Sequence, residues 1–397
     1  MDDARAEFWG DLQSDFYTTT STLYLANQSL ETVLSTNGYK AHKPILSQPS
    51  IRDYTPHSDI TFDQKTAEKQ TLTVDQFPTA AEVIDITEKS QSPYDLLGHS
   101  SQAIRRGLIN RTEQLFNSNF SSAAHNINNG TYFELTPGNI LEVIEEADGT
   151  IGAFDAPTDT NMKCAVFGPR TVAMLRRAKA ERETGLGDSV LANGVIGPWK
   201  GWTIVQNNNL PWSATLGIAT NPTAGDTVTI MGRQIEFVAS LSGLTTSAAG
   251  PDHGYVLIGG SAAATVDNLV ALINGAAGAG TTYVDFDSVS AFIIRNKRRI
   301  TATDNTTSIA LAGFGDVTVT DNLTAGADGF TNERQDSIFM MRGAIDLVMQ
   351  FMDLQIGDKE KGFADLPKGI IGVGSKMFHD GSLMSVKVPQ DVSGWNA

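Results

Sequence analysis

The sequence predicts a mixed α+β protein of several domains, on the strength of three features. The chain has 397 residues, and at about 150 residues per domain this is room for two to three domains. Segments in which apolar and polar residues alternate, as in strands, are interspersed with segments of helical periodicity. The composition also changes at residues 214–330, where glycine, threonine and alanine are abundant, so this stretch is predicted to be a small inserted α+β domain.

The composition excludes several classes of protein. Lys and Arg total 29 against 45 Asp and Glu, which gives a net charge of −16 and argues against a coat that neutralises phosphates or docks on anionic lipid. The single cysteine, Cys164, excludes a disulfide framework within the chain. No run approaches about 18 apolar residues, and the acidic N-terminus has no hydrophobic signal core. We therefore expect neither a membrane anchor nor export, and a protein that stays in the cytosol until lysis.

The first 45 residues are polar and mixed, and we interpret them as an extended arm, with a disordered tail as the alternative. A hairpin is predicted next, with Ile60 and Phe62 on one strand and Leu72 and Val74 on the other, around a polar tip at 64–70. Its four apolar side chains share one face. Because an isolated hairpin is marginal in water, that face needs a cover, either from the rest of its own domain or from a neighbouring subunit.

A long helix follows the hairpin. Ser92 and Pro93 are typical of a helix start, and one apolar stripe then runs to about Phe120. The stripe consists of Leu97, Ile104, Leu108 and Leu115. A helix this long with a single stripe predicts a spine against which a flat surface packs.

Alternating strands and helices predict an α/β layer after the long helix. The signals are a helix from Thr136–Pro137, a buried strand at 163–167, a helix from Pro169, and a glycine turn that leads into a strand within 194–205. Within the inserted segment we expect a hairpin at 226–238, a helix near 265–274, and strands at 290–294, 299–302 and 317–319. The C-terminal part, 369–388, reads as glycine-punctuated β structure.

No catalytic or cofactor-binding constellation emerges. The six histidines are scattered, Cys164 sits in an apolar run, and Ser375 precedes Lys376 in the glycine-rich stretch 369–376, the reverse of a phosphate-binding loop. We therefore predict no enzyme, no metal and no cofactor. One dense basic cluster is a candidate polyanion contact, with a solvated turn as the simpler interpretation. It comprises Arg295, Lys297, Arg298 and Arg299.

The order of these parts, together with four local stretches, resembles the major capsid proteins of tailed phages, the Hong Kong 97 type. The stretches are Thr71–Leu97, Val166–Leu175, Gly197–Pro211 and Phe378–Val388. Residues 214–330 depart from the simplest form of that family, as an insertion would. The resemblance implies a phage major capsid fold with this division: an N-terminal arm (1–45), an extended hairpin loop (46–90), a peripheral domain with the spine helix (91–150), an axial domain in two parts (151–213 and 331–362), the inserted surface domain (214–330), and closing peripheral strands with the C-terminus (363–397).

The resemblance also implies a structural function. Such a protein self-assembles into hexamers and pentamers of an icosahedral head, which encloses double-stranded DNA without sequence-specific binding. A portal protein and scaffolding or cement proteins would be its partners, with no membrane involved. It would be part of the virion and be assembled in the host cytoplasm. Two alternatives stay open: an encapsulin-type compartment shell, and a phage tail, baseplate or carbohydrate-binding surface protein that carries the glycine-rich module.

Overall fold

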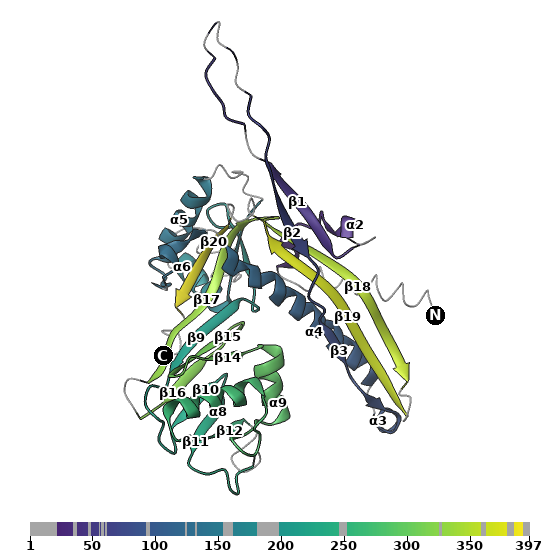
Figure 1. Ribbon diagram of the computed structural model, residues 1–397, viewed down its shortest axis with the longest axis vertical. Helices are drawn as coiled ribbons and strands as arrows, with labels where there is room; N and C mark the ends of the chain where they lie inside the picture. The colour runs from purple at the N-terminus through teal and green to yellow at the C-terminus, as the bar shows by residue number, and fades with distance from the viewer. Residues whose placement is uncertain are drawn as a thin grey trace. The chain divides into compact units, whose positions relative to one another are not determined.

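The computed structural model forms two compact units (Figure 1). Unit 1 comprises Met1–Asn119 and Met341–Met384, and unit 2 comprises Phe120–Met340 and Ser385–Ala397. The structure describes residues 22–34, 38–46, 49–54, 56, 59, 62–92, 96–123, 125–131, 133–153, 162–180, 198–245, 252–324, 328–358, 363–378 and 385–391.

Unit 1 is built on a long antiparallel strand pair and one long helix. The pair is β18 (Ile345–Asp358) with β19 (Ala364–Met377), and the short strands β3 (Thr79–Ala81) and β4 (Ile84–Asp85) also pair with β19. Helix α4 (Leu96–Ser118) packs on β19 and buries Ile104, Leu108 and Phe116. The spine helix predicted from its apolar stripe is confirmed. The short helix α3 (Ile86–Gln91), between β4 and α4, was not predicted.

The hairpin of unit 1 has a different register from the predicted one. Strand β1 (Lys40–Leu46) pairs with β2 (Ala67–Thr73), with Lys40 opposite Thr73 and Leu46 opposite Ala67. The predicted pairing of 60–63 with 72–75 is therefore wrong, and the boundary placed at residue 45 falls inside β1. Pro44 and the lysines beside it hide the strand periodicity of β1, although proline is tolerated in a strand without a neighbour on both sides.

The part of the predicted arm that the structure describes is anchored on unit 1. The 3-10 turn η1 (Leu23–Leu25) buries both of its leucines, and helix α2 (Glu31–Leu34) ends at the buried Leu34. Between them, Asn27 bonds through its backbone to Ile345 O at 2.9 Å and to Leu347 N at 3.0 Å. Residues 22–34 thus lie along β18, whereas residues 1–21 are outside the described part.

Unit 2 contains a nine-stranded sheet flanked by two helices. The strands are β5 (His125–Asn126), β6 (Phe133–Glu134), β7 (Lys163–Phe167), β8 (Thr203–Gln206), β9 (Pro211–Gly217), β14 (Thr301–Asp304), β15 (Ser308–Phe314), β17 (Gly329–Met341) and β20 (Ser385–Asp391). The helices are α5 (Ile140–Gly152) and α6 (Pro169–Ala180). Phe339 packs edge-on against Phe167 and Trp202, at ring-centroid distances of 5.3 and 5.0 Å. The strands and helices predicted around 140–206 are confirmed.

A second sheet of unit 2 lies within the glycine-rich segment. Its strands are β10 (Thr227–Ile230), β11 (Arg233–Val238), β12 (His253–Leu257), β13 (Tyr283–Val284) and β16 (Val319–Asn322). Figure 1 shows helix α8 (Ala262–Asn274) lying across it. Val228, Phe237 and Leu269 are among its fully buried side chains. The predicted hairpin and helix are confirmed.

The strand predicted at 290–294 is wrong, because this stretch is helical. It forms α9 (Ser288–Ala291) and a π-helix (Phe292–Lys297). The Asp287 carboxylate accepts hydrogen bonds from the backbone amides of Val289 and Ser290, and so caps the helix start. An apolar run of this length satisfies both periodicities, and the N-cap decides between them.

The glycine-rich segment shares a sheet with the rest of unit 2. Strand β9 pairs with β15 on one side and with β17 on the other, so the boundaries predicted at 214 and 330 fall inside β9 and β17. Trp212 and Leu216 of β9 belong to the same apolar core as Val228 and Phe237. At the far edge of this sheet, Asn274 bonds to both backbone groups of Ala302, at 2.8 and 2.9 Å, and thereby covers the open edge of β14.

We predict that the segment folds alone only when it includes β9. A fragment of residues 210–330 should unfold cooperatively on heating, because β9 pairs with β15 and contributes Trp212 and Leu216 to the apolar core of the segment. The matched fragment 218–324 lacks β9 and should show no cooperative transition. Circular dichroism at increasing temperature tests both. A cooperative transition in the shorter fragment, or none in the longer one, would contradict this division.

Candidate functional site

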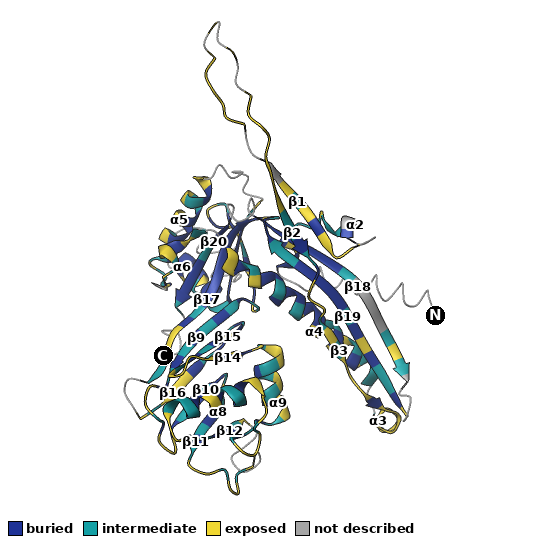
Figure 2. Cartoon of the chain, in the orientation of Figure 1, coloured by how far each residue is buried: buried dark blue, intermediate teal, exposed yellow. Residues whose placement is uncertain are grey.

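Large apolar side chains are exposed on the hairpin of unit 1 beyond β1 and β2. Ile51 is 98% exposed, Phe62 88% and Tyr54 65%. Figure 2 shows this part of the chain as exposed along its described length. Exposed apolar groups gathered on one element mark an interaction surface, whereas scattered ones do not. We call Ile51, Tyr54 and Phe62 the hairpin patch.

Polar contacts hold the two sides of the hairpin together next to these side chains. The guanidinium of Arg52 donates to Asp63 Oδ1 at 2.7 Å, and the backbone amide of Ser50 donates to Asp63 Oδ2 at 2.7 Å. The hydrogen bonds from Ser50, followed by that from Arg52, lower the pKa of the Asp63 carboxyl. Asp63 is therefore ionised at neutral pH and ties the two sides of the loop to each other.

The four predicted hairpin residues do not form one face. Leu72 and Val74 are buried in a core of unit 1 formed with Leu34, Ala41, Val348 and Phe378. Phe62 is exposed, and Ile60 lies outside the described residues. Leu72 and Val74 thus find their cover within their own unit, because β2 crosses β19 where Gly374 leaves room for it. A Cβ on Gly374 would lie 2.7 Å from the carbonyl oxygen of Thr73.

A second apolar group, which sequence reasoning missed, lies at one end of the β18–β19 sheet. We call it the sheet-end patch. It comprises Val83, Ile86, Ile356 and Phe363, with exposures of 60, 47, 57 and 81%. The backbone amide of Ile86 donates to Phe363 O at 3.0 Å, which places α3 beside the turn-proximal end of β19. The available sequence signal was Phe363, a lone aromatic residue after the polar run 358–362.

The structure divides the predicted basic cluster into two kinds of side chain. Arg295 donates to Asp285 Oδ1 at 2.6 Å and to Ile273 O at the end of α8 at 3.1 Å, so it ties α8 to the π-helix. Arg298 donates to Asn208 O at 3.2 Å, and burial lowers its pKa, opposed by the charge of Asp316. Lys297 and Arg299 are exposed. The polyanion contact stays a prediction, now centred on the exposed members.

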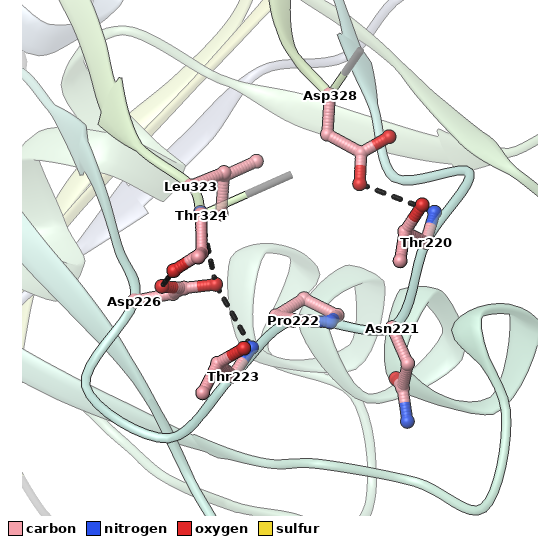
Figure 3. Close-up of a pocket in the computed structure, with 8 residues that line it drawn as sticks. All are labelled: Thr220, Asn221, Pro222, Thr223, Asp226, Leu323, Thr324 and Asp328. Carbon is pink, nitrogen blue, oxygen red and sulfur yellow. Dashed lines mark hydrogen bonds between the residues drawn. The ribbon is translucent and has the colours of Figure 1, made fainter. Parts of the chain in front are cut away.

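A pocket of about 200 Å³ opens in unit 2, lined on one side by residues between Thr220 and Asp226 and on the other by Leu323, Thr324 and Asp328 (Figure 3). Asp226 accepts from the backbone amides of Thr223 at 2.8 Å and Thr324 at 3.3 Å, and from the Thr324 hydroxyl. Burial acts to raise the pKa of Asp226, but these hydrogen bonds outweigh it and hold the pKa below the usual value. Asp328 accepts from the amides of Ala219 and Thr220. Both carboxylates therefore serve to fix loops.

Neither metal-binding clusters nor membrane helices are found in the described residues. Across these ranges no three His, Cys, Asp or Glu side chains are grouped to hold an ion. No helix in the same ranges is long and apolar enough to cross a membrane.

No protein-family model and no curated protein matches the sequence. A solved chain of Mycobacterium phage Che8 is similar over 93% of this chain and 90% of its own, with a TM-score of 0.54 and 12% identity. The chain has the capsid fold of tailed phages. The capsid of cyanophage P-SCSP1u is also similar, with a TM-score of 0.48 and 13% identity over 89% of this chain and 84% of its own. The mature capsid of bacteriophage PhiM1 is similar with a TM-score of 0.45 and 13% identity, over 90% of this chain and 83% of its own.

This confirms the fold that the sequence resemblance implied. Along the chain the hairpin of unit 1 comes first and the long helix α4 second. The α/β elements of unit 2 follow, and the strand pair β18–β19 comes after them, which is the expected order. At 12% identity the similarity to the phage chain is one of fold and not of sequence motifs. This low identity explains why the order of the predicted elements was more informative than any single motif.

We predict opposite effects on folding for two hairpin residues. Leu72→Ala should lower the free energy of unfolding of the unassembled chain by about 2–5 kcal/mol, because it leaves a cavity in the core of unit 1. Phe62→Ala should change it by less than about 0.5 kcal/mol, because Phe62 touches little in the single chain. Urea unfolding measures both. Equal losses would show that the two residues share one environment.

The Asp226 carboxylate predicts a pH-dependent contribution to stability. Because its folded-state pKa lies below 3.8, its stabilisation is present above that value and is lost as pH falls through the folded-state pKa. Asp226→Asn should therefore cost about 1–3 kcal/mol at pH 7 and progressively less below pH 3.8. Thermal unfolding of both proteins between pH 7 and pH 3 measures this, and a pH-independent difference would contradict it.

Proposed function

We propose that the chain is the major capsid protein of a tailed phage, a structural protein that self-assembles into hexamers and pentamers. These form the icosahedral head that encloses the double-stranded DNA genome. The protein would then belong to the virion and be assembled in the host cytoplasm, with a portal and, where needed, scaffolding or cement proteins as partners. Its role is not catalytic, since a shell acts through the contacts between its copies.

The observation that carries the proposal is the pair of apolar patches on a chain with a capsid fold. A single copy leaves Phe62, Ile51 and Phe363 more than four-fifths exposed. Exposed side chains of this size favour association, because burying one contributes about 1.5–3 kcal/mol. Repeated contacts between identical copies would bury them without any other partner.

The hairpin patch is suited to reach a neighbouring copy. Its side chains lie beyond the β1–β2 ladder, where the described residues of the same chain do not cover them. The Arg52–Asp63 pair keeps the loop together while it is extended. We infer that residues 49–66 lie over the adjacent subunit.

The charge of the chain fits a container for DNA. At −16 the subunit as a whole repels phosphates, so the wall would enclose DNA without binding its backbone tightly. Within this proposal Lys297 and Arg299 remain candidates for a local polyanion contact. Residues 214–330 would form a domain on the outer surface of the shell.

Negative-stain electron microscopy of the purified protein tests the proposal. Hexamers, pentamers or closed icosahedral shells are the expected particles. Small shells filled with a cargo protein would instead indicate an encapsulin-type compartment. Tubes, trimers or monomers at high concentration would indicate a tail component or a binding module, and would overturn the proposal.

Phe62→Asp should reduce the yield of shells about tenfold or more while the subunit stays folded, because it removes an apolar contact from every copy. The matched control is Phe292→Asp, which changes a residue 55% exposed in unit 2 and should leave assembly unchanged. Sedimentation of assembly mixtures gives the yield, and circular dichroism checks the fold. Normal shell yield from Phe62→Asp would remove the hairpin from the assembly contacts.

A further inference from the structure

Two helices of unit 2 carry opposite charges. Helix α5 contains four carboxylates and no cation, namely Glu142, Glu145, Glu146 and Asp148. Helix α6 contains four cations and no carboxylate, namely Arg170, Arg176, Arg177 and Lys179. The overall acidity of the chain does not explain this separation of charge, because every charged residue of α6 is basic although the chain has a net charge of −16.

Contacts within the chain account for only part of these charges. Asp148 pairs with Lys163 at 2.5 Å, and Glu145 pairs with Lys200. On the basic helix, Arg170 pairs with Asp316 at 3.0 Å, and Lys179 is buried with its ammonium 5.9 Å from the ring centroid of Trp199. These side chains serve the fold of unit 2.

Exposed charges on the two helices form two faces. Glu142 and Glu146 are exposed and lie one turn apart on the same side of α5. Arg176 and Arg177 are exposed near the C-terminal end of α6. No ion pair joins Glu142, Glu146 or Arg176 to any residue in the described part of the chain. We call them the acidic face and the basic face.

We propose that the acidic face of α5 in one copy docks on the basic face of α6 in the next copy, and that this contact closes the rings of the capsomer. The inference rests on the proposed function and adds which surfaces meet. Opposite charges across an interface steer association and disfavour wrong registers. Because the two faces lie on different helices, a docked pair of copies still offers one free acidic face and one free basic face. Contacts of this head-to-tail type continue around a ring until it closes.

Charge reversal with a swap tests the pairing. Arg176→Glu and Glu146→Arg each place like charges in the contact, and each should weaken association between copies about tenfold. The double variant Arg176→Glu/Glu146→Arg restores opposite charges in swapped positions and should recover ring formation. Because these side chains are exposed, every variant should unfold at the temperature of the wild type. Native mass spectrometry and electron microscopy give the fraction of protein in rings.

Matched controls separate this contact from a general effect of charge. Arg106→Glu and Asp267→Arg make the same charge changes at exposed positions outside both helices, and should form rings like the wild type. Ring formation by the wild type should also weaken as salt rises from 50 to 500 mM, because the distance over which exposed charges act falls from about 14 Å to about 4 Å.

Each other outcome has a definite meaning. Normal rings from both single variants would overturn the proposal, as would a double variant that fails like the singles. Loss of rings in the control variants would show a general charge effect and would also overturn it. If the wild type forms no rings, the proposed function itself is contradicted. If rings form whatever the charges on the two faces, only the pairing of α5 with α6 is contradicted.

Discussion

The packing of helix α4 on strands β18 and β19 is the interaction on which unit 1 depends. Two strands of 14 residues each form most of this sheet, and the short strands β3 and β4 extend it over only a few residues, so the sheet needs a covering layer to be stable in water. Helix α4 supplies that layer with Ile104, Leu108 and Phe116, and its C-terminal end is fixed where Asn119 donates to the Ser375 hydroxyl at 2.8 Å. Residues 22–34 add a second contact along β18. The sheet of β18 and β19 is therefore elongated, and α4 alone does not cover its ends.

These uncovered ends link the fold to the proposed function. Phe62 and Phe363 contribute little to the stability of a single copy, because both are more than four-fifths exposed. Their burial against a second copy would instead favour association. The two charged helices of unit 2 would act in the same contacts between copies. The apolar patches would supply affinity, and the charges would select which face of the partner is bound.

The sequence predicted best the features that arise from local periodicity. The stripe around Ile104 and Leu108 predicted α4, and the alternation at 226–238 predicted a hairpin, because each pattern is contained within its element. Pairing between distant segments was not predictable in the same way. The partner of β2 is β1, more than 20 residues earlier, and Pro44 hides its periodicity. The exposed patches could not be identified before the cores were known, since an apolar residue in a sequence does not reveal whether it is covered. Leu72 and Phe62, similar in the sequence, have opposite environments for this reason.

The central claim is that copies of this chain bury the apolar groups that one copy leaves exposed. Hydrogen–deuterium exchange on unassembled subunits and on assembled shells measures this directly at the backbone. Assembly should slow exchange at residues 49–54, 62–66 and 83–86, while β10 and β11 in the core of the second sheet exchange alike in both states. Equal exchange of the hairpin and sheet-end residues in subunits and shells would contradict the claim.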